Sequence, residues 1–361
     1  MSLSERMSKA MVSKDRSANL ERSLLPSPSL LLRTPSESLD APDGTDLPRH
    51  DDALHDEYFS SKAVLSGHEA AVYAVQFSPT GRSLASTSLD KTVRAWSSNG
   101  SSDNVVLGRH DMAGTDVRWL KDDLVASSSL DQTVCFWSFP KGDCLSSYKL
   151  DSHALCLASG TSEHLVFAGV SSGAVFVLDS RSPVPNVAWR GDSSANALAY
   201  HADRGELFVG DSKGQMTVLD GRQFGVIAQV AVSETSDSKP ISGITCSASL
   251  VACNSYDAVL RIFDVESRTL LHSLRGHHNR NWPIRSVLVS SGSSDYIASG
   301  SASHSCYLYG PLRSKQVSPT LIQKLKGHGG NVYATDYCKD TLVSCSADAT
   351  IRLWRKSFAS S

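Results

Sequence analysis

The chain has 361 residues, of which 40% are hydrophobic and 20% are charged, and its formal net charge is −2 at pH 7. This composition is typical of a globular protein. The near-neutral charge argues against a protein whose main function is to bind a nucleic-acid backbone through positive charge. A membrane-spanning helix needs roughly 18 consecutive apolar residues, and no stretch of the sequence approaches that length. We therefore expect no membrane-spanning helix.

Residues 1–57 differ in composition from the rest of the chain. They contain ten serines and five prolines but no aromatic residue and no cysteine, and from Glu37 to Glu57 they hold eight acids against Arg49 alone. Such a segment cannot bury enough apolar surface to offset the entropy lost on ordering. We therefore expect a disordered Ser/Pro-rich arm over residues 1–57 and a folded domain over residues 58–361, which carries 28 basic and 26 acidic residues, a net +2.

The rest of the chain is periodic. Short runs rich in β-forming residues end in an aromatic residue or a leucine, and successive ends lie 41 to 46 residues apart. The run ends are Ala95-Trp96, Phe136-Trp137, Leu178-Asp179, Leu219-Asp220, Phe263-Asp264, Tyr309-Gly310 and Leu353-Trp354. A period of this length, with four short strands per unit, is typical of propeller blades. Seven units fit the chain.

Two further motifs mark the units. Gly-His pairs stand ahead of three of them, at Gly67-His68, Gly276-His277 and Gly327-His328. With the Asp that lies six residues before the closing aromatic in four units, these pairs resemble the WD-repeat family from about residue 62 to residue 355. The resemblance implies an all-β fold, a seven-bladed WD40 β-propeller. The run 62–65 then supplies the fourth strand of the last blade, because an open sheet edge invites aggregation.

Three units carry His, Ser, Asp and Trp at matching positions, like catalytic triads. The sets are His68, Ser88, Asp90 and Trp96; His110, Ser129, Asp131 and Trp137; and His328, Ser346, Asp348 and Trp354. A hydrolase needs one nucleophile, one base and one oxyanion hole in a single cleft, which three copies around a ring do not provide. The family resemblance instead implies structural tetrads, in which hydrogen bonds run from Asp through His and Ser to the indole N–H.

Other signals of chemistry are missing from the sequence. It has no Walker A loop, no H-E-x-x-H motif and no third ligand beside His277-His278. The eight cysteines form no C-x-x-C pair, and the N-terminus shows no secretory signal, so we expect buried, reduced thiols. We predict no catalytic residue, no cofactor and no metal site, with a propeller hydrolase as the alternative of a different class.

By resemblance, partners bind the loops on the face that carries the Gly-His pairs, called here the top rim. Its candidate contact residues are Tyr73, Leu89, Thr115, Leu130, Tyr256, Trp282, Arg285 and Tyr333. Aromatic and arginine side chains dominate protein interfaces, so this set favours a protein or peptide partner. The alternatives are that several of them pack the channel wall and that Trp282 folds back over the blade edge.

Four features resemble the WD-repeat subunit of the U5 small nuclear ribonucleoprotein. They are residues 65–69 with 72–73, the linker 99–104 before Arg109-His110, the D-x-R pairs that follow Leu178 and Leu219, and residues 279–285 followed by 297–302. That resemblance implies a non-enzymatic scaffold in pre-mRNA splicing that is located in the nucleus, with the cytoplasm as the alternative. The protein would then be a monomeric propeller that binds large core splicing proteins. We expect it to bind no nucleic acid directly in a sequence-specific way and to have no membrane partner.

Two D-x-R pairs lead to a different reading of the function. The pairs are Asp179 with Arg181 and Asp220 with Arg222. They resemble the motif by which substrate receptors dock on a cullin ligase adaptor. A receptor of a cullin ubiquitin ligase is therefore one alternative function, and a peptide or histone reader in a chromatin complex, using Tyr73 and Tyr333, is another.

Overall fold

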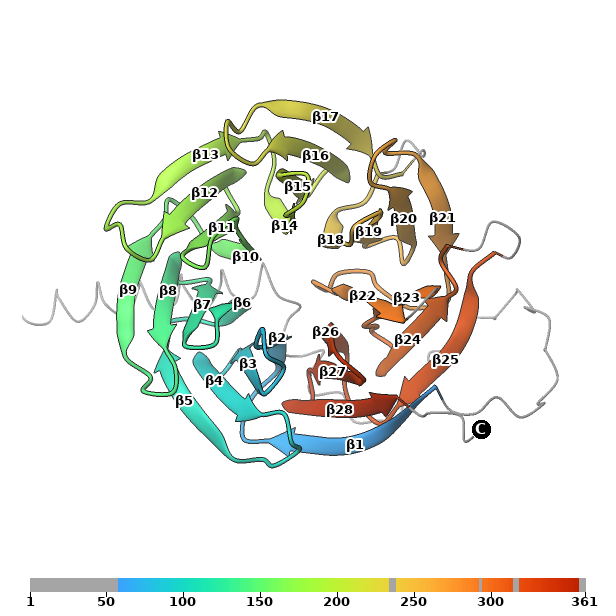
Figure 1. Cartoon of the computed structure of the whole chain (residues 1–361), viewed down its shortest axis with the longest axis horizontal. Helices are drawn as coiled ribbons and strands as arrows, with labels where there is room; N and C mark the ends of the chain where they lie inside the picture. The colour runs from blue at the N-terminus through green and yellow to red at the C-terminus, as the bar shows by residue number, and fades with distance from the viewer. Residues whose placement is uncertain (1–57, 234–237, 292–293, 314–317, 357–361) are drawn as a thin grey trace, which may run out of the picture. The chain divides into compact units, whose positions relative to one another are not determined.

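The structure, a computed structural model, describes residues 58–233, 238–291, 294–313 and 318–356. The expected arm of residues 1–57 lies outside these residues. The described part contains β-strands and no helix, and hydrogen bonds join the strands into seven four-stranded antiparallel sheets. Figure 1 shows the sheets arranged as blades around a central axis. The all-β, seven-bladed propeller predicted from the repeat is confirmed.

The blades are numbered in chain order. Blade 1 holds β2 (Val72–Phe77), β3 (Ser83–Ser88), β4 (Thr92–Ser97) and β5 (Asn104–Arg109), and blade 2 holds β6 (Gly114–Lys121), β7 (Leu124–Ser129), β8 (Thr133–Ser138) and β9 (Cys144–Lys149). Blade 3 holds β10 (Ala154–Ser159), β11 (Leu165–Val170), β12 (Ala174–Asp179) and β13 (Asn186–Arg190), and blade 4 holds β14 (Ala195–His201), β15 (Glu206–Asp211), β16 (Gln215–Asp220) and β17 (Val226–Ala231). Blade 5 holds β18 (Ile241–Cys246), β19 (Leu250–Ser255), β20 (Leu260–Asp264) and β21 (Leu270–Leu274), and blade 6 holds β22 (Ser286–Ser291), β23 (Ser294–Ser299), β24 (Ser305–Gly310) and β25 (Thr320–Lys326). Blade 7 holds β26 (Val332–Cys338), β27 (Thr341–Ser346), β28 (Thr350–Lys356) and β1 (Phe59–Ser66).

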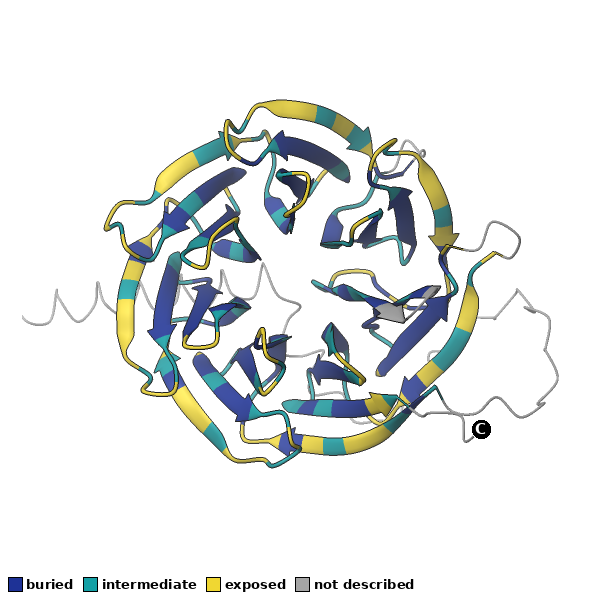
Figure 2. Cartoon of the chain, in the orientation of Figure 1, coloured by how far each residue is buried: buried dark blue, intermediate teal, exposed yellow. Residues whose placement is uncertain are grey.

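Burial falls from the inner strands to the outer strand of each blade. In blade 2, every residue of β7 is buried, whereas most of the outer strand β9 is exposed. Figure 2 shows the same contrast around the ring. Neighbouring sheets cover both faces of an inner strand, and the inner strands are therefore runs of apolar and small residues.

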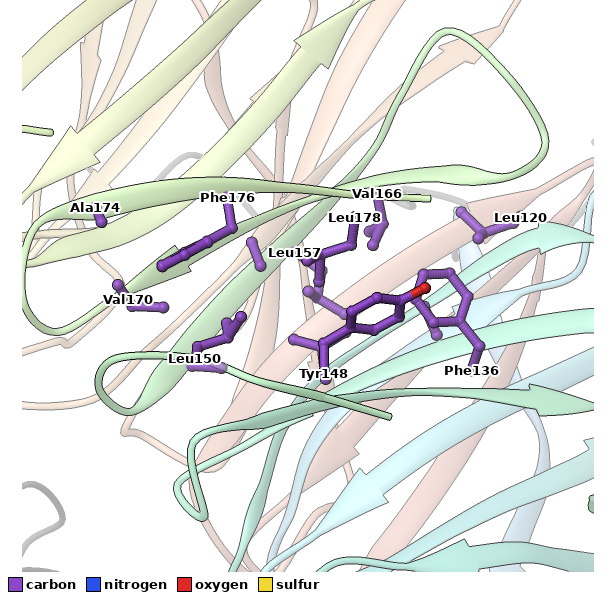
Figure 3. Close-up of a cluster of buried hydrophobic side chains, with 14 of the residues drawn as sticks. Leu120, Phe136, Tyr148, Leu150, Leu157, Val166, Val170, Ala174, Phe176 and Leu178 are labelled. Carbon is purple, nitrogen blue, oxygen red and sulfur yellow. The ribbon is translucent and has the colours of Figure 1, made fainter. Parts of the chain in front are cut away.

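Adjacent blades pack face to face through apolar side chains. In the cluster between blades 2 and 3, the rings of Phe136 and Tyr148, both from blade 2, meet edge to face with centroids 5.6 Å apart. Leu157 and Phe176 of blade 3 belong to the same cluster (Figure 3). Each of the seven blade junctions has such a cluster. Because burial of one such side chain contributes about 1.5–3 kcal/mol, these junctions hold the ring together.

The ring closes with a strand from the N-terminal side of the propeller. β1 pairs antiparallel with β28, with Leu65 opposite Ile351. The side-chain amide of Gln323 in β25 adds a second tie, since it accepts from the Phe59 N–H and donates to the Phe59 carbonyl, both at 2.8 Å. The predicted closing strand is confirmed, although it begins at Phe59 and not at Lys62.

Among the described residues, no helical segment has the length and apolar character that crossing a bilayer requires.

Candidate functional site

Blade 1 carries a buried hydrogen-bond chain at the top rim. His68 Nδ1 lies 2.8 Å from Asp90 Oδ2, and His68 Nε2 lies 2.8 Å from Ser86 Oγ. The Trp96 indole N–H donates to the same hydroxyl at 2.8 Å. An Asp–His–Ser–Trp chain is therefore present as the resemblance implied, but its serine is Ser86 and not the predicted Ser88.

The same correction applies to blades 2 and 7. The observed sets are His110, Ser127, Asp131 and Trp137, and His328, Ser344, Asp348 and Trp354. The predicted serines, Ser129 and Ser346, lie two residues further along each strand and point to the same sheet face, so sequence spacing does not separate them. In blade 1, the Ser88 hydroxyl instead donates to the Ala70 carbonyl and accepts from the Asp90 N–H, both at 3.0 Å, and so shapes the turn that carries the Asp.

A threonine that the sequence analysis did not single out completes each chain. The Thr92 hydroxyl donates to Asp90 Oδ1 at 2.6 Å, and Thr133 and Thr350 occupy the same place in blades 2 and 7. The D-x-T spacing common to the three blades was the available signal. Burial alone would raise the pKa of Asp90, but hydrogen bonds from His68 and Thr92 outweigh it and lower the pKa well below its usual range. Each Asp is therefore a structural carboxylate.

Blade 6 keeps only part of this arrangement. The backbone N–H of His277 donates to the Tyr309 hydroxyl at 3.1 Å. Ser299, at the serine position, instead accepts from Asn254 of blade 5 at 2.9 Å. The ring nitrogens of His277 have no hydrogen-bond partner among the described residues. Burial lowers the pKa of His277 to about 4, so this imidazole is neutral at physiological pH.

An aromatic row forms the top rim where blades 6, 7 and 1 meet. The Tyr333 ring lies between those of Trp282 and Tyr73, with centroids 5.3 Å and 5.1 Å away. Tyr333 is fully buried, and Tyr73 and Leu130 are only 5% and 2% exposed. The expectation that these three side chains contact a partner is therefore wrong, because they pack inside the ring, which was the alternative.

Trp282 is half-buried, and its side chain is folded back over the blade edge. With the Asn331 amide oriented so that both its atoms are satisfied, the Trp282 indole N–H donates to the amide oxygen at 3.1 Å and the amide nitrogen donates to the Ala302 carbonyl at 2.8 Å. Leu89 and Tyr256 are also part-exposed. Contact of Trp282, Leu89 and Tyr256 with a partner stays a prediction.

Arg285 spans the central channel. Its Nη1 lies 2.7 Å from Oδ1 of Asp116 in blade 2, and Asp116 is fully buried. The same carboxylate accepts from Arg118 at 3.1 Å. A buried carboxylate needs paired charges, so Arg285 is a tie across the ring and not the rim anchor expected from the sequence. Thr115 is likewise engaged, since its hydroxyl donates to the Ala154 carbonyl of blade 3 at 2.7 Å.

The channel holds a polar cavity of about 250 Å³, lined by residues that include Arg118, Arg285 and Asp336. Burial raises the pKa of Asp336 to about 6, although its bond from the Phe77 N–H opposes the shift. Burial also raises the pKa of Cys246, another lining residue, to about 12. The wall therefore offers hydrogen-bond partners but no thiolate nucleophile.

The next feature is the arrangement of the thiols and of the metal-binding residue types among the described residues. The eight cysteines are free thiols. In the part of the chain that the structure describes, no three His, Cys, Asp or Glu side chains gather where they could hold a metal ion.

The two D-x-R pairs lie at the ends of β12 and β16, on the face opposite the top rim, and they differ in detail. Asp179 holds the exposed guanidinium of Arg181 with an N–O distance of 2.8 Å, and this hydrogen bond lowers the pKa of Asp179 to about 2. Both aspartates accept from the backbone N–H of the arginine two residues on, at 2.9 Å from Arg181 and 2.8 Å from Arg222, but among the described residues only Arg181 also turns its guanidinium to its aspartate. Docking of these pairs on a ligase adaptor stays a prediction.

The seven-bladed ring defines the class of protein, a β-propeller, and the Asp–His–Ser–Trp chains of blades 1, 2 and 7 are those that the WD-repeat resemblance implied. The family model for the WD domain, G-beta repeat, matches residues 59–97, 268–310 and 319–355. The match covers about a third of the chain and shows similarity to the WD40-repeat family over these three segments.

Similar proteins include the WD repeat-containing protein 26 homolog of Arabidopsis thaliana, which is 25% identical over 81% of this chain and 49% of its own length. The target of rapamycin complex subunit wat1 of Schizosaccharomyces pombe is 27% identical over 64% of this chain and 74% of its own length. THO complex subunit 3 of Arabidopsis thaliana is 24% identical over 65% of this chain and 75% of its own length. The chain thus spans about half the length of the first of these relatives.

Proposed function

We propose that the protein is a non-enzymatic subunit of a multi-protein assembly and that it binds its partners through the top rim. The observation that carries the proposal is the structural role of the His, Ser and Asp residues in blades 1, 2 and 7. In all three, the serine hydroxyl is buried and accepts a hydrogen bond from an indole of its own blade. These groups stabilise the blades and leave the propeller a rigid frame for surface loops, where binding residues concentrate.

The names of two relatives support the role of subunit. One is a subunit of a target of rapamycin complex and the other a subunit of the THO complex. The part-exposed rim residues Leu89, Tyr256 and Trp282 support a protein partner, because such side chains anchor protein interfaces.

As a finer proposal, the assembly is the U5 small nuclear ribonucleoprotein, the partners are core splicing proteins and the compartment is the nucleus. The support for this step is the resemblance of the sequence segments named above, and the names of the three relatives do not mention U5. A cullin-ligase receptor is the second candidate, favoured by the 64% exposure of Arg181 in a D-x-R pair.

Affinity purification of the tagged full chain, followed by mass spectrometry, tests the proposal. We expect a stable set of co-purifying proteins, and we expect Trp282→Ala to weaken their binding by about 1–2 kcal/mol. Trp189→Ala, on the outer strand β13, is the matched control and should leave binding unchanged. Purification of the chain alone, or equal effects of the two variants, would contradict binding through the top rim. Loss of partners on Arg181→Ala would favour the ligase receptor.

A further inference from the structure

The segment from Ser267 to Thr335 carries an unbalanced positive charge. It contains eight Lys and Arg residues and a single acid, Asp295, which gives a net charge of +7. Residues 58–361 as a whole carry +2, so the remainder of the propeller is at −5 (2 − 7). Positive charge is thus concentrated on blade 6 and its two junctions.

Ion pairs neutralise three of the seven basic residues that the structure describes in this segment. These pairs are Arg268 with Glu206, Arg285 with Asp116 and Arg313 with Asp295, at N–O distances of 3.2, 2.7 and 2.5 Å. The other four are Arg275, Arg280, Lys324 and Lys326, which are exposed. No ion pair neutralises these four among the described residues, and together they are named here the cationic patch.

Two members of the cationic patch, Arg275 and Arg280, lie in the loop that joins β21 to β22 at the top rim. This loop packs on the turn between β23 and β24. The His278 N–H donates to the Ser301 hydroxyl at 2.9 Å, and the His278 carbonyl accepts from the Ala302 N–H at 2.8 Å. The loop is therefore held over the top of blade 6.

The other two members lie on the outer strand of the same blade. Lys326 is paired with Ser305, the first residue after that turn. The Lys324 ammonium lies 5.0 Å from the centroid of the Tyr307 ring, and Tyr307 packs in the cluster between blades 5 and 6 with Leu274, the residue before Arg275. Both lysines thus lie beside the loop, on the side of blade 6 that faces blade 5.

Two acids at the top rim of the neighbouring blades already have hydrogen-bonding partners. Asp257 of blade 5 lies 2.7 Å from Arg261, and Asp348 of blade 7 lies 2.9 Å from His328. The four exposed cations without ion-pair partners give the cationic patch a positive charge, and the half-buried Trp282 lies two residues after Arg280 in the same loop.

We propose that the cationic patch binds an acidic segment of a protein partner. The inference rests on the proposed function and adds the chemistry of the partner. Four cations beside an aromatic ring match a short run of Asp and Glu with an apolar side chain. A long polyanion such as RNA fits poorly, because beyond the patch it meets the part of the propeller that carries −5.

Titrations by fluorescence anisotropy test this on the full chain. The probes are a labelled 21-residue peptide of seven Glu-Asp-Leu repeats and a labelled 14-nucleotide single-stranded RNA. The test variant is R280E/K326E, and the control, with the same change of charge, is K141E/K213E, at exposed lysines of blades 2 and 4. A second background changes the eight acids between Glu37 and Glu57 to Asn or Gln, so that the chain's own acidic segment does not compete with the probe.

We expect the peptide to bind more tightly than the RNA in both backgrounds. Exposed ion pairs contribute factors of about 1.5 to 5 each in affinity, and reversal adds repulsion, so R280E/K326E should weaken peptide binding about tenfold or more. The control should change it less than twofold. Tighter RNA binding, equal losses in the two variants, or no peptide binding in the second background would overturn the proposal. If R280E/K326E still co-purifies the wild-type partners at wild-type yield, the cationic patch is not their site, although the proposed function stands.

Discussion

Replacing Ser86 with Ala tests the corrected tetrad of blade 1. The hydroxyl is fully buried, accepts from the Trp96 indole N–H and contacts His68 Nε2, both at 2.8 Å. Ser86→Ala leaves these two groups without a partner, and each unsatisfied buried polar group costs about 1–3 kcal/mol. Alanine has almost the same volume, so no cavity adds to the cost. We expect the free energy of unfolding to fall by about 2–4 kcal/mol.

Ser88→Ala is the matched control, because it makes the same chemical change two residues along the same strand. Its partners are the Ala70 carbonyl and the Asp90 N–H in part-buried bonds, so we expect a loss of about 1 kcal/mol. Urea denaturation followed by far-UV circular dichroism compares the two variants. If Ser88→Ala were as destabilising as Ser86→Ala, or more so, the assignment of Ser86 to the tetrad would be refuted.

Three further predictions follow from the channel and the arm. Arg285→Ala leaves Arg118 as the remaining ion-pair partner of buried Asp116, so we expect unfolding to become easier by about 2 kcal/mol in urea denaturation; an unchanged midpoint would show that the tie does not stabilise the ring. The pKa of Asp336 is raised to about 6, against about 3.9 in the unfolded chain, so the folded state binds this proton more tightly. Stability should therefore fall as pH rises from about 4 to 6, and Asp336→Asn should remove that fall; parallel pH profiles of denaturation midpoint would contradict it. Deleting residues 1–57 should leave the thermal midpoint unchanged within about 2 °C, and loss of folded protein would show that the arm belongs to the core.

The blades were predictable from sequence because each unit repeats the same local pattern. A run of apolar and small residues that ends in an aromatic residue or a leucine recurs in each unit, and four units also carry the turn Asp. The burial of inner strands on both faces requires the apolar runs. The closing strand was predictable for the same reason, since the last unit supplies only three strands and the segment from Ala63 to Leu65 precedes the first complete blade.

The details of the site depend on contacts that no local pattern encodes. Ser86 and Ser88 share one sheet face, so only the position of the Trp96 ring decides between them. Arg285 reaches Asp116 across 169 residues of sequence, a contact that exists only once the ring has closed. Local spacing describes a blade, whereas these contacts depend on how the chain arranges its blades in space.

Lysine cross-linking and mass spectrometry of the purified assembly test partner binding at the top of blades 5 and 6 most directly. Lys324 and Lys326 lie beside the top rim, whereas Lys121, Lys141 and Lys339 lie in or next to loops of the opposite face. We expect cross-links to partner proteins to concentrate at Lys324 and Lys326. Cross-links concentrated at the lysines of the opposite face would contradict the account.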